Sequence, residues 1–423
     1  MTELSEFGTP PTMPDGPLAP AVAPALNALV ASSLSQAHWD PGDVAMFDAI
    51  AASGDPRLGW VLVDMLRFTW RPQFRAALAA TGAQLLNLKI DGPLKRAAFT
   101  DHLIAWDVPA YPGYLDHKRA IYTQYLPGLE RVFAPGDIDW HMVSTGGVNI
   151  DARPFGAPAS PCDCIPAIDT PEVATATKAT WLSDDAVVFG ISVGDAHRAY
   201  PRRIMEVREM VNDTLGGRAL GIPYCTLCGA AQAYFTDVEG IDRPILRTSG
   251  LLIRSNKVMY DVRTYSVFDT FRGRAVTGPL AEAGIGLEPV TVITTTWGDW
   301  KAAHPDTTVL LERDALGRDY DLRNTRDAGG PIFPIGDVDP RLGVQDDVLG
   351  VIAPSGRPVA FLRSAALAAL RSGAPVTLDD VQLVLEAGGI RALDADGADL
   401  GSHQAFWFAW SQFHPDTALW PVP

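Results

Sequence analysis

Cysteine is scarce in this chain of 423 residues, which contains four. The cysteines form two close pairs, Cys162 with Cys164 and Cys225 with Cys228. The first residues show no basic segment followed by an apolar run, so we expect no secretory leader and predict a cytoplasmic location. Because thiols stay reduced in the cytoplasm, the four cysteines are not expected to form a disulfide framework.

The chain also lacks an excess of positive charge and long apolar runs. Its net charge of -16 disfavours nucleic acid and anionic membranes as partners, because both repel an acidic surface. No stretch approaches the roughly 18 apolar residues of a membrane span, so none is expected. The signatures of nucleotide-binding loops, zinc proteases and serine hydrolases are absent, so no nucleotide cofactor is expected. An unknown small molecule is left as the expected substrate.

The order of the sequence patterns predicts an α+β fold. Residues 1–22 are rich in proline, glycine and small residues, which predicts a flexible arm. Residues 23–150 show apolar residues at helical spacing between prolines and glycines, which predicts an α-helical domain. Residues 151–345 show strand-like segments, among them two strands joined by a tight turn at Gly194-Asp195, which predicts a β-rich α+β domain.

An internal duplication is predicted within the β-rich part. The segment WGDWKAAHPDT at 297–307 recurs as WFAWSQFHPDT at 407–417. Residues 346–423 are therefore expected to form a shorter, degenerate second copy packed on the first. Because both segments keep the histidine, His304 and His414 are expected to be structural. The second copy contains no cysteine, so thiol chemistry is expected in the first copy.

The segment YCTLC contains the most concentrated chemistry of the chain. A C-x-x-C turn places Cys225 and Cys228 close enough to chelate one metal ion or to form a disulfide. Thiolates are soft ligands, which favours Cu or Zn as the cofactor. The alternative interpretation is a pair of buried, unreactive sulfur atoms.

Three other sulfur-containing residues are candidate metal ligands. Cys162 and Cys164 could complete a four-thiolate site, or could resolve an oxidised Cys225 or Cys228, or could be incidental loop thiols. Met259 could add a thioether, which favours Cu(I), although methionines in strands more often fill a core.

Charged residues near the thiols in the sequence are candidates for the walls of a site. Arg208 and Glu209 could line a pocket in which the guanidinium lowers a thiol pKa, or could lie on a solvated helix face. Asp261 is a third candidate. The candidate catalytic set is Cys225, Cys228, Arg208, Glu209 and Asp261, and the candidate metal ligands are Cys225, Cys228, Met259, Cys162 and Cys164.

The segment from about 165 to 311 resembles a bacterial family known as domain of unknown function 3179 (DUF3179). The resemblance rests on motifs in a fixed order, which are IPAI (165–168), RAYP (198–201), EMVND (209–213), YCTLC (224–228), SGLL (249–252) and MYD (259–261). The family pattern has a histidine where this chain has Arg208, and a proline where it has Thr226. If that histidine ligates a metal in relatives, the change disfavours a metal here and favours thiol or anion chemistry.

Two functional hypotheses follow. The first is a thiol-based protein that binds Cu or Zn at Cys225 and Cys228, or a metal- or thiol-dependent enzyme of redox or lyase type. The alternative is a non-catalytic interaction or scaffold protein that binds a protein partner through its N-terminal helices.

Overall fold

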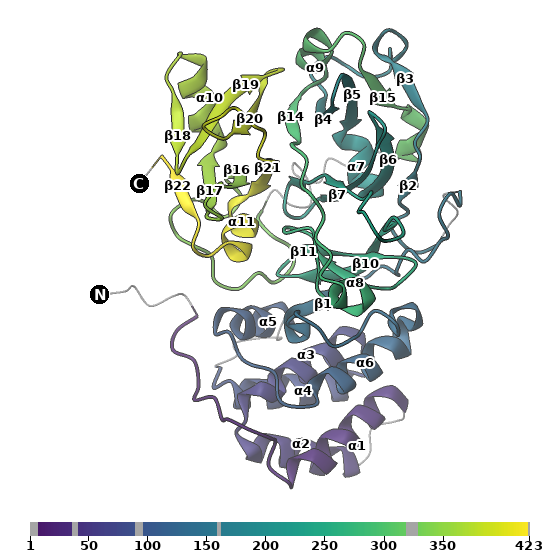
Figure 1. The fold of residues 1–423 in the computed structure, drawn as a ribbon. Coiled ribbons are helices and arrows are strands. Elements are labelled where there is room, and N and C mark those ends of the chain that lie inside the picture. The colour runs from purple at the N-terminus through teal and green to yellow at the C-terminus, as the bar shows by residue number, and fades with distance from the viewer. Residues whose placement is uncertain (1–6, 36–40, 89–95, 159–161, 319–328, 422–423) are drawn as a thin grey trace. The chain divides into compact units, whose positions relative to one another are not determined.

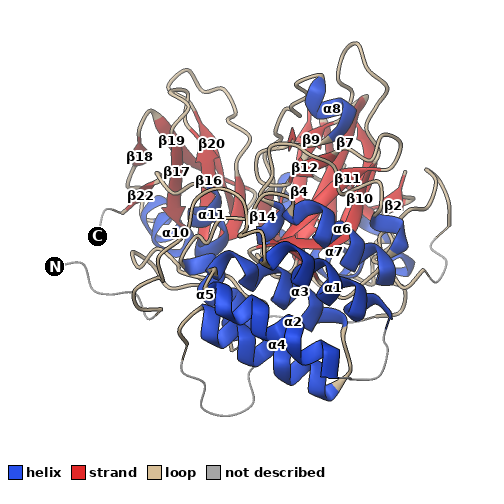
Figure 2. Ribbon diagram, turned by 90° about the horizontal axis from the view of Figure 1, so that it is seen from below, coloured by secondary structure: helices blue, strands red, loops and turns tan. Residues whose placement is uncertain are grey.

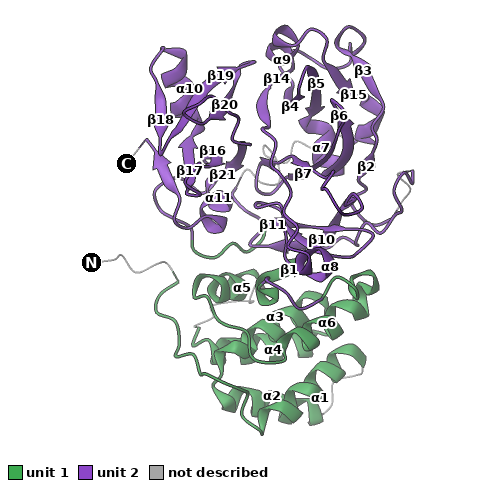
Figure 3. Cartoon of the chain, in the orientation of Figure 1, with its two compact units in different colours: residues 1–133, 139–144, 333–337 green, residues 134–138, 145–332, 338–423 purple. Residues whose placement is uncertain are grey.

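The structure, a computed structural model, describes residues 7–35, 41–88, 96–158, 162–318 and 329–421 (Figure 1). Its contacts divide the chain into two compact units, which Figure 3 distinguishes by colour. Unit 1 comprises Met1–Phe133, Asp139–Ser144 and Phe333–Asp337, and unit 2 comprises Ala134–Ile138, Thr145–Ile332 and Val338–Pro423. No helix of the described part is both long and apolar enough to cross a membrane.

Unit 1 is helical (Figure 2). Its helices are α1 (Val22–Ser35), α2 (Pro41–Ser53), α3 (Gly59–Phe68), α4 (Pro72–Leu85), α5 (Arg96–Ala105) and α6 (Tyr114–Tyr125), with the short helices η1 (Pro56–Leu58), η2 (Pro127–Leu129) and η3 (Trp140–Met142). Helix α3 is buried from Gly59 to Leu66. Asp64 on this helix accepts hydrogen bonds from Lys118 Nζ at 3.0 Å and from the Tyr122 hydroxyl at 3.1 Å, so a satisfied buried charge joins α3 to α6.

The first half of unit 2 contains three sheets. One has the order β14-β4-β5-β15-β3, the second the order β2-β6-β7-β8 with β9 also on β7, and in the third β10, β11, β12 and β13 follow one another. The predicted turn at Gly194 is confirmed, since β4 and β5 pair antiparallel around it and Gly194 has φ +56°.

The strands of this half are β2 (Ile168–Asp169), β3 (Val173–Thr175), β4 (Val187–Val193), β5 (Ala196–Pro201), β6 (Met210–Leu215), β7 (Arg218–Cys225), β8 (Ala230–Ala231), β9 (Tyr234–Phe235), β10 (Leu246–Ile253), β11 (Asn256–Asp261), β12 (Val267–Asp269), β13 (Arg274–Ala275), β14 (Ile293–Thr296) and β15 (Thr308–Leu310). Strand β1 (Val143–Thr145) precedes them where the chain passes from unit 1 to unit 2. The helices are η4 (Ala176–Lys178), α7 (Arg202–Arg208), α8 (Gly278–Glu282), α9 (Trp297–Ala303) and η5 (Glu312–Ala315).

The second half of unit 2 contains two sheets, in the orders β21-β16-β17-β22 and β18-β19-β20. Its elements are β16 (Asp347–Ile352), β17 (Pro358–Leu362), α10 (Arg363–Arg371), β18 (Val376–Leu378), β19 (Val381–Glu386), β20 (Gly389–Leu393), β21 (His403–Phe406), α11 (Trp407–Phe413) and β22 (Ala418–Trp420). The order β21-β16-β17-β22 matches β14-β4-β5-β15, and in both sheets the last two strands are parallel and the others antiparallel.

The repeated tryptophan motif has the same contacts in both halves. A Cβ on Gly190 of β4 would lie closer than 3.0 Å to the ring of Trp300, and Gly350 of β16 has the same relation to Trp410. Each of these indoles donates a hydrogen bond of 2.9 Å to the threonine that ends its motif. The motif therefore fixes a helix against a strand, while an origin by duplication stays a prediction.

The predicted α+β class is confirmed. N-terminal helices are followed by a part that is rich in strands, as Figure 2 shows by colour. The core around the predicted site is formed by buried residues of β4 to β8, including Phe189, Ile222 and Tyr224.

Candidate functional site

The two thiols of the C-x-x-C segment lie on a tight turn between β7 and β8. Cys225 ends β7, where it pairs with Ala230 of β8, and the backbone N–H of Cys228 donates to the carbonyl oxygen of Cys225 at 3.2 Å. Gly229 follows with φ +58°, and a Cβ there would lie 3.0 Å from the ring of Phe406. The turn therefore requires glycine after the second cysteine, both for its backbone conformation and for space.

Both sulfur atoms are buried under the hairpin turn between β10 and β11. Cys225 is 2% exposed and Cys228 is 0% exposed, and both keep their thiol groups. Cys228 Sγ lies 3.4 Å from the carbonyl oxygen of Ser255 and 3.4 Å from Oδ1 of Asn256, so either oxygen can accept its single S–H proton. The Cys225 sulfur lies 3.7 Å from the same Ser255 oxygen and accepts the backbone N–H of Lys257 at 3.4 Å.

A buried ion pair adjoins the thiols. Lys257 Nζ lies 3.3 Å from Oε2 of Glu209, and it donates to the carbonyl oxygen of Glu209 and, at 3.2 Å, to that of Tyr224. Thr226, inside the C-x-x-C turn, donates to Oε1 of Glu209 at 3.1 Å. We call the set Cys225, Cys228, Glu209, Ser255, Asn256 and Lys257 the dithiol site.

The electrostatics of the dithiol site favour a thiolate at Cys225. Burial raises the pKa of this thiol, but hydrogen bonds from the Cys228 thiol and from the backbone N–H of Lys257 outweigh it, so the pKa lies below its ordinary value. Burial lowers the pKa of the Lys257 ammonium, although Glu209 and Cys225 oppose the change. A lowered pKa raises the fraction of Cys225 that is thiolate, the form that acts as nucleophile and metal ligand.

Glu209 is the one predicted charged residue that the structure brings to the thiols. It caps α7 in a left-handed conformation with φ 51°, which turns the chain from α7 into β6. Its side chain is 17% exposed and contacts both Lys257 and Thr226. This geometry agrees with its predicted place in the wall of the site.

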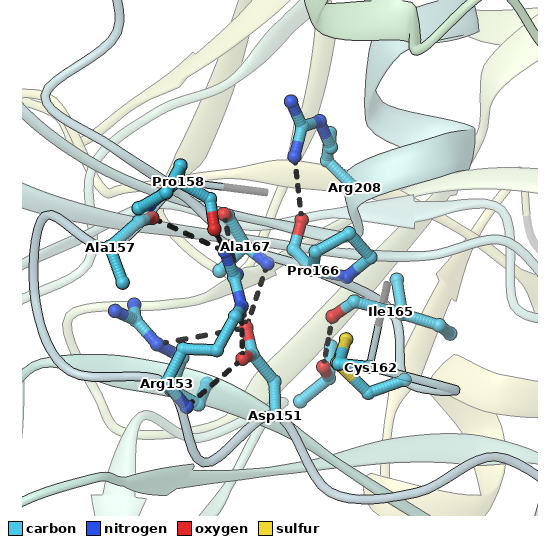
Figure 4. The surroundings of a disulfide bond; sticks show 12 residues. Asp151, Arg153, Ala157, Pro158, Cys162, Ile165, Pro166, Ala167 and Arg208 are labelled. Atoms are coloured by element: carbon cyan, nitrogen blue, oxygen red, sulfur yellow. Dashed lines mark hydrogen bonds and ion pairs between the residues drawn. A yellow bond between two sulfur atoms is a disulfide. The ribbon is translucent and has the colours of Figure 1, made fainter. Parts of the chain in front are cut away.

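Arg208 has a structural role. Its Nε donates to the carbonyl oxygen of Asp314 at 2.7 Å and its Nη1 to that of Pro166 at 3.2 Å, the second of which is visible in Figure 4. The guanidinium therefore joins the end of α7 to two distant segments. These contacts explain the burial of Arg208 without any role for it in lowering a thiol pKa.

Asp261 and Met259, at the end of β11, are also explained by folding. Asp261 accepts hydrogen bonds from the backbone N–H of Ile245 at 2.7 Å and from the N–H and hydroxyl of Thr264, each at 2.8 Å, which fixes the turn after β11. Met259 is fully buried in an apolar cluster that includes Met210 and Phe268. The core interpretation of Met259 agrees with this packing.

Cys162 and Cys164 form a disulfide with a Cα–Cα distance of 5.0 Å. Asp163 between them has φ 48°, which brings the two side chains to the same side of the chain. This bond corrects the expectation that all four cysteines stay reduced. In the disulfide state neither sulfur of this pair is a thiolate. Figure 4 shows the bond beside the ion pair of Arg153 with Asp151, whose Nε and Oδ1 are 2.7 Å apart.

The sequence did not point to Lys257, Ser255 or Asn256. The sequence feature that could have pointed to them is a short polar segment, RSNK, between the apolar stretches GLLI and VMYD. Among the described residues there is no group of three or more His, Cys, Asp or Glu side chains placed to hold a metal ion.

A sequence model of the family described as "Protein of unknown function (DUF3179)" matches residues 162–399. This is more than half of the 423 residues, and the chain belongs to this family. The predicted family is thereby confirmed, and the match extends beyond the expected end at about 311 into the second half of unit 2. No curated protein and no solved structure matches the chain.

Proposed function

We propose that this member of the DUF3179 family binds Cu(I) through the thiolates of Cys225 and Cys228. The observation that carries the proposal is the placement of two buried thiols on one turn, with hydrogen bonds that favour ionisation of Cys225. Metal ligation requires deprotonated thiols, so a lowered thiol pKa favours binding at neutral pH.

The donor atoms of the dithiol site suit Cu(I) better than Zn²⁺. Two thiolates are soft ligands and suffice for Cu(I), which forms two-coordinate thiolate complexes. The neighbouring oxygen acceptors, the Ser255 carbonyl and Asn256 Oδ1, are hard ligands. A structural zinc site uses four ligands, of which this turn supplies two sulfur atoms.

A cation beside the thiols offsets part of the charge of a Cu(I) dithiolate. Binding of Cu(I) displaces two thiol protons, so the sulfur pair and the ion together carry one negative charge. The Lys257 ammonium beside Cys225 stabilises that charge, and Glu209 keeps the ammonium paired when the thiols are protonated. The chain thus provides the ligands, a counter-charge and shielding from water.

A second candidate function is dithiol–disulfide exchange, which the lowered pKa of Cys225 favours. The Cys225 thiolate would attack a small-molecule disulfide, forming a mixed disulfide and releasing one substrate thiolate, which takes up a proton. Cys228 would then lose its proton and attack the Cys225 sulfur, releasing the second substrate thiol and forming a Cys225–Cys228 disulfide. Two electrons pass from the protein to the substrate. Burial of both sulfur atoms restricts this reaction to small substrates.

The test is competition for Cu(I) against a chromophoric Cu(I) chelator under anaerobic, reducing conditions. The Cys162→Ser/Cys164→Ser variant serves as the background, because its two remaining cysteines are those of the dithiol site. We expect one Cu(I) per chain in this background, and loss of binding when Cys225→Ser or Cys228→Ser is added. Failure of the background protein to withdraw copper from the chelator would contradict the proposal. Reduction of a small disulfide by the copper-free background protein would support the second candidate instead.

A further inference from the structure

The disulfide between Cys162 and Cys164 joins residues that are two positions apart in the chain. Asp163 between them has a left-handed backbone with φ 48°, so a local turn brings the sulfur atoms together. The stabilisation that a disulfide gives to a fold grows with the length of the loop that it closes. A loop this short restricts the unfolded chain little, so a need for stability does not explain the bond.

Hydrogen bonds hold the segment around the disulfide in place. The backbone N–H of Asn149 donates to the carbonyl oxygen of Asp163 at 2.8 Å, and Asn149 forms a parallel β-bridge with Cys164. The Thr248 hydroxyl donates to the carbonyl oxygen of Ile165 at 2.7 Å. None of these contacts uses a sulfur atom, so the segment keeps its position when the bond is opened.

The disulfide is more accessible to solvent than the dithiol site. Cys162 and Cys164 are half-buried and Asp163 between them is exposed, whereas Cys225 and Cys228 are buried. A disulfide opens when a thiolate attacks one of its sulfur atoms, so the attacking thiol must reach that atom. Exposed disulfides are accordingly the ones that exchange, while structural disulfides resist reduction.

From these observations we infer that Cys162 and Cys164 form a redox site that exchanges with small thiols and small disulfides, such as the two forms of glutathione. Solvent reaches the bond, its loop closure adds little stability, and the hydrogen bonds around it keep the segment in place in either redox state. The site is distinct from the dithiol site, and the inference does not depend on metal binding there.

The exchange takes place in two steps. The thiolate of a first small thiol attacks one sulfur of the Cys162–Cys164 bond, which forms a mixed disulfide and releases the other cysteine as a thiolate. The thiolate of a second small thiol attacks the small-molecule sulfur of the mixed disulfide, which releases the second cysteine and forms a small disulfide. Two electrons pass from the small thiols to the protein, and the two protons that these thiols lose are taken up by the cysteines. A small disulfide reverses both steps.

Equilibration of the Cys225→Ser/Cys228→Ser protein with glutathione buffers, followed by alkylation and mass spectrometry, tests the inference. The reduced fraction should rise from about one tenth to about nine tenths when the ratio of squared reduced glutathione to oxidised glutathione increases about 80-fold, as a two-electron exchange requires. The near-ultraviolet circular dichroism of the tryptophans should stay unchanged, because the hydrogen bonds of the segment preserve the fold. The rate of reduction should rise in proportion to the glutathione concentration, because the attack takes place on the folded protein.

The same alkylation of the unaltered protein, with the modified peptides identified, does not depend on whether the variant folds. Cys162 and Cys164 should become alkylated after glutathione treatment without denaturant. Thiols that appear only in denaturant, or a reduction that abolishes the tryptophan signal, would identify a structural cross-link and overturn the inference. Cysteines 162 and 164 that stay unbonded in excess oxidised glutathione would overturn it as well. Copper binding is measured in the complementary Cys162→Ser/Cys164→Ser protein, so the two proposals fail independently.

Discussion

Replacement of Lys257 by methionine is the sharpest test of the dithiol site as a folded unit. The Lys257 side chain is 4% exposed, and its Nζ lies 3.3 Å from Oε2 of Glu209 and 3.2 Å from the carbonyl oxygen of Tyr224. Methionine has a similar length and removes the charge. The Glu209 carboxylate then loses the cation that compensates its burial, while the hydrogen bond from Thr226 remains.

The size of the effect follows from burial. Removal of one partner of a buried ion pair costs about 3–5 kcal/mol, because the other charge stays behind uncompensated. The Glu209 side chain is 17% exposed and regains some hydration, so we expect a loss near the lower limit, about 3 kcal/mol. A second change, Glu209→Gln, should restore most of this loss because it removes the isolated charge.

The free energy of unfolding of unit 2 is measured by urea titration with pulsed alkylation of the dithiol site. The Cys162→Ser/Cys164→Ser background leaves Cys225 and Cys228 as the alkylated groups. Lys301→Met is the matched control, since Lys301 pairs with Asp184 at 2.5 Å in a more exposed ion pair that is worth about 0–1 kcal/mol. Equal losses in Lys257→Met and Lys301→Met, or no recovery with Glu209→Gln, would refute the reasoning.

Two further predictions concern the second unit. Gly190→Ala and Gly350→Ala should each lower the free energy of unfolding by about 1–3 kcal/mol in differential scanning calorimetry, because the new Cβ overlaps a buried indole. The control is Gly286→Ala, where a Cβ meets no atom within 4 Å, and it should change stability by less than about 0.5 kcal/mol. Equal effects at all three positions would contradict the packing. Burial lowers the pKa of His403 to about 4 in the folded state, whereas it is about 6.5 in the unfolded state. Between about pH 6.5 and pH 4 the unfolded state therefore binds a proton that the folded state does not bind. Stability should therefore fall by about 3 kcal/mol as pH drops from 6.5 to 4, and His403→Gln should lose this contribution in pH-dependent urea unfolding.

Local patterns in the sequence predicted the parts of the fold that depend on local chemistry. Apolar residues at helical spacing predicted the N-terminal helices, and the expected tight turn at Gly194 predicted the β4–β5 hairpin. The motifs in their fixed order predicted membership of the DUF3179 family. The C-x-x-C spacing predicted two sulfur atoms on one turn, because that geometry is closed within four residues.

The surroundings of the thiols could not be predicted, because they come from residues about 30 positions away. The β10–β11 hairpin brings Ser255, Asn256 and Lys257 over the sulfur atoms, and pairing between distant strands decides this contact. Arg208 was a candidate because it precedes the thiols in the sequence, and Asp261 because it lies in the motif MYD. In the fold Arg208 points to Pro166 and Asp314, and Asp261 fixes a turn.

X-ray absorption at the copper edge tests the central claim most directly. It is applied to the anaerobic, copper-loaded Cys162→Ser/Cys164→Ser protein, in which Cys225 and Cys228 are the sulfur ligands available from cysteine. Our account predicts monovalent copper with two sulfur neighbours, and loss of that signal in Cys225→Ser and in Cys228→Ser. A first shell of nitrogen and oxygen alone, or a spectrum that neither substitution changes, would contradict it.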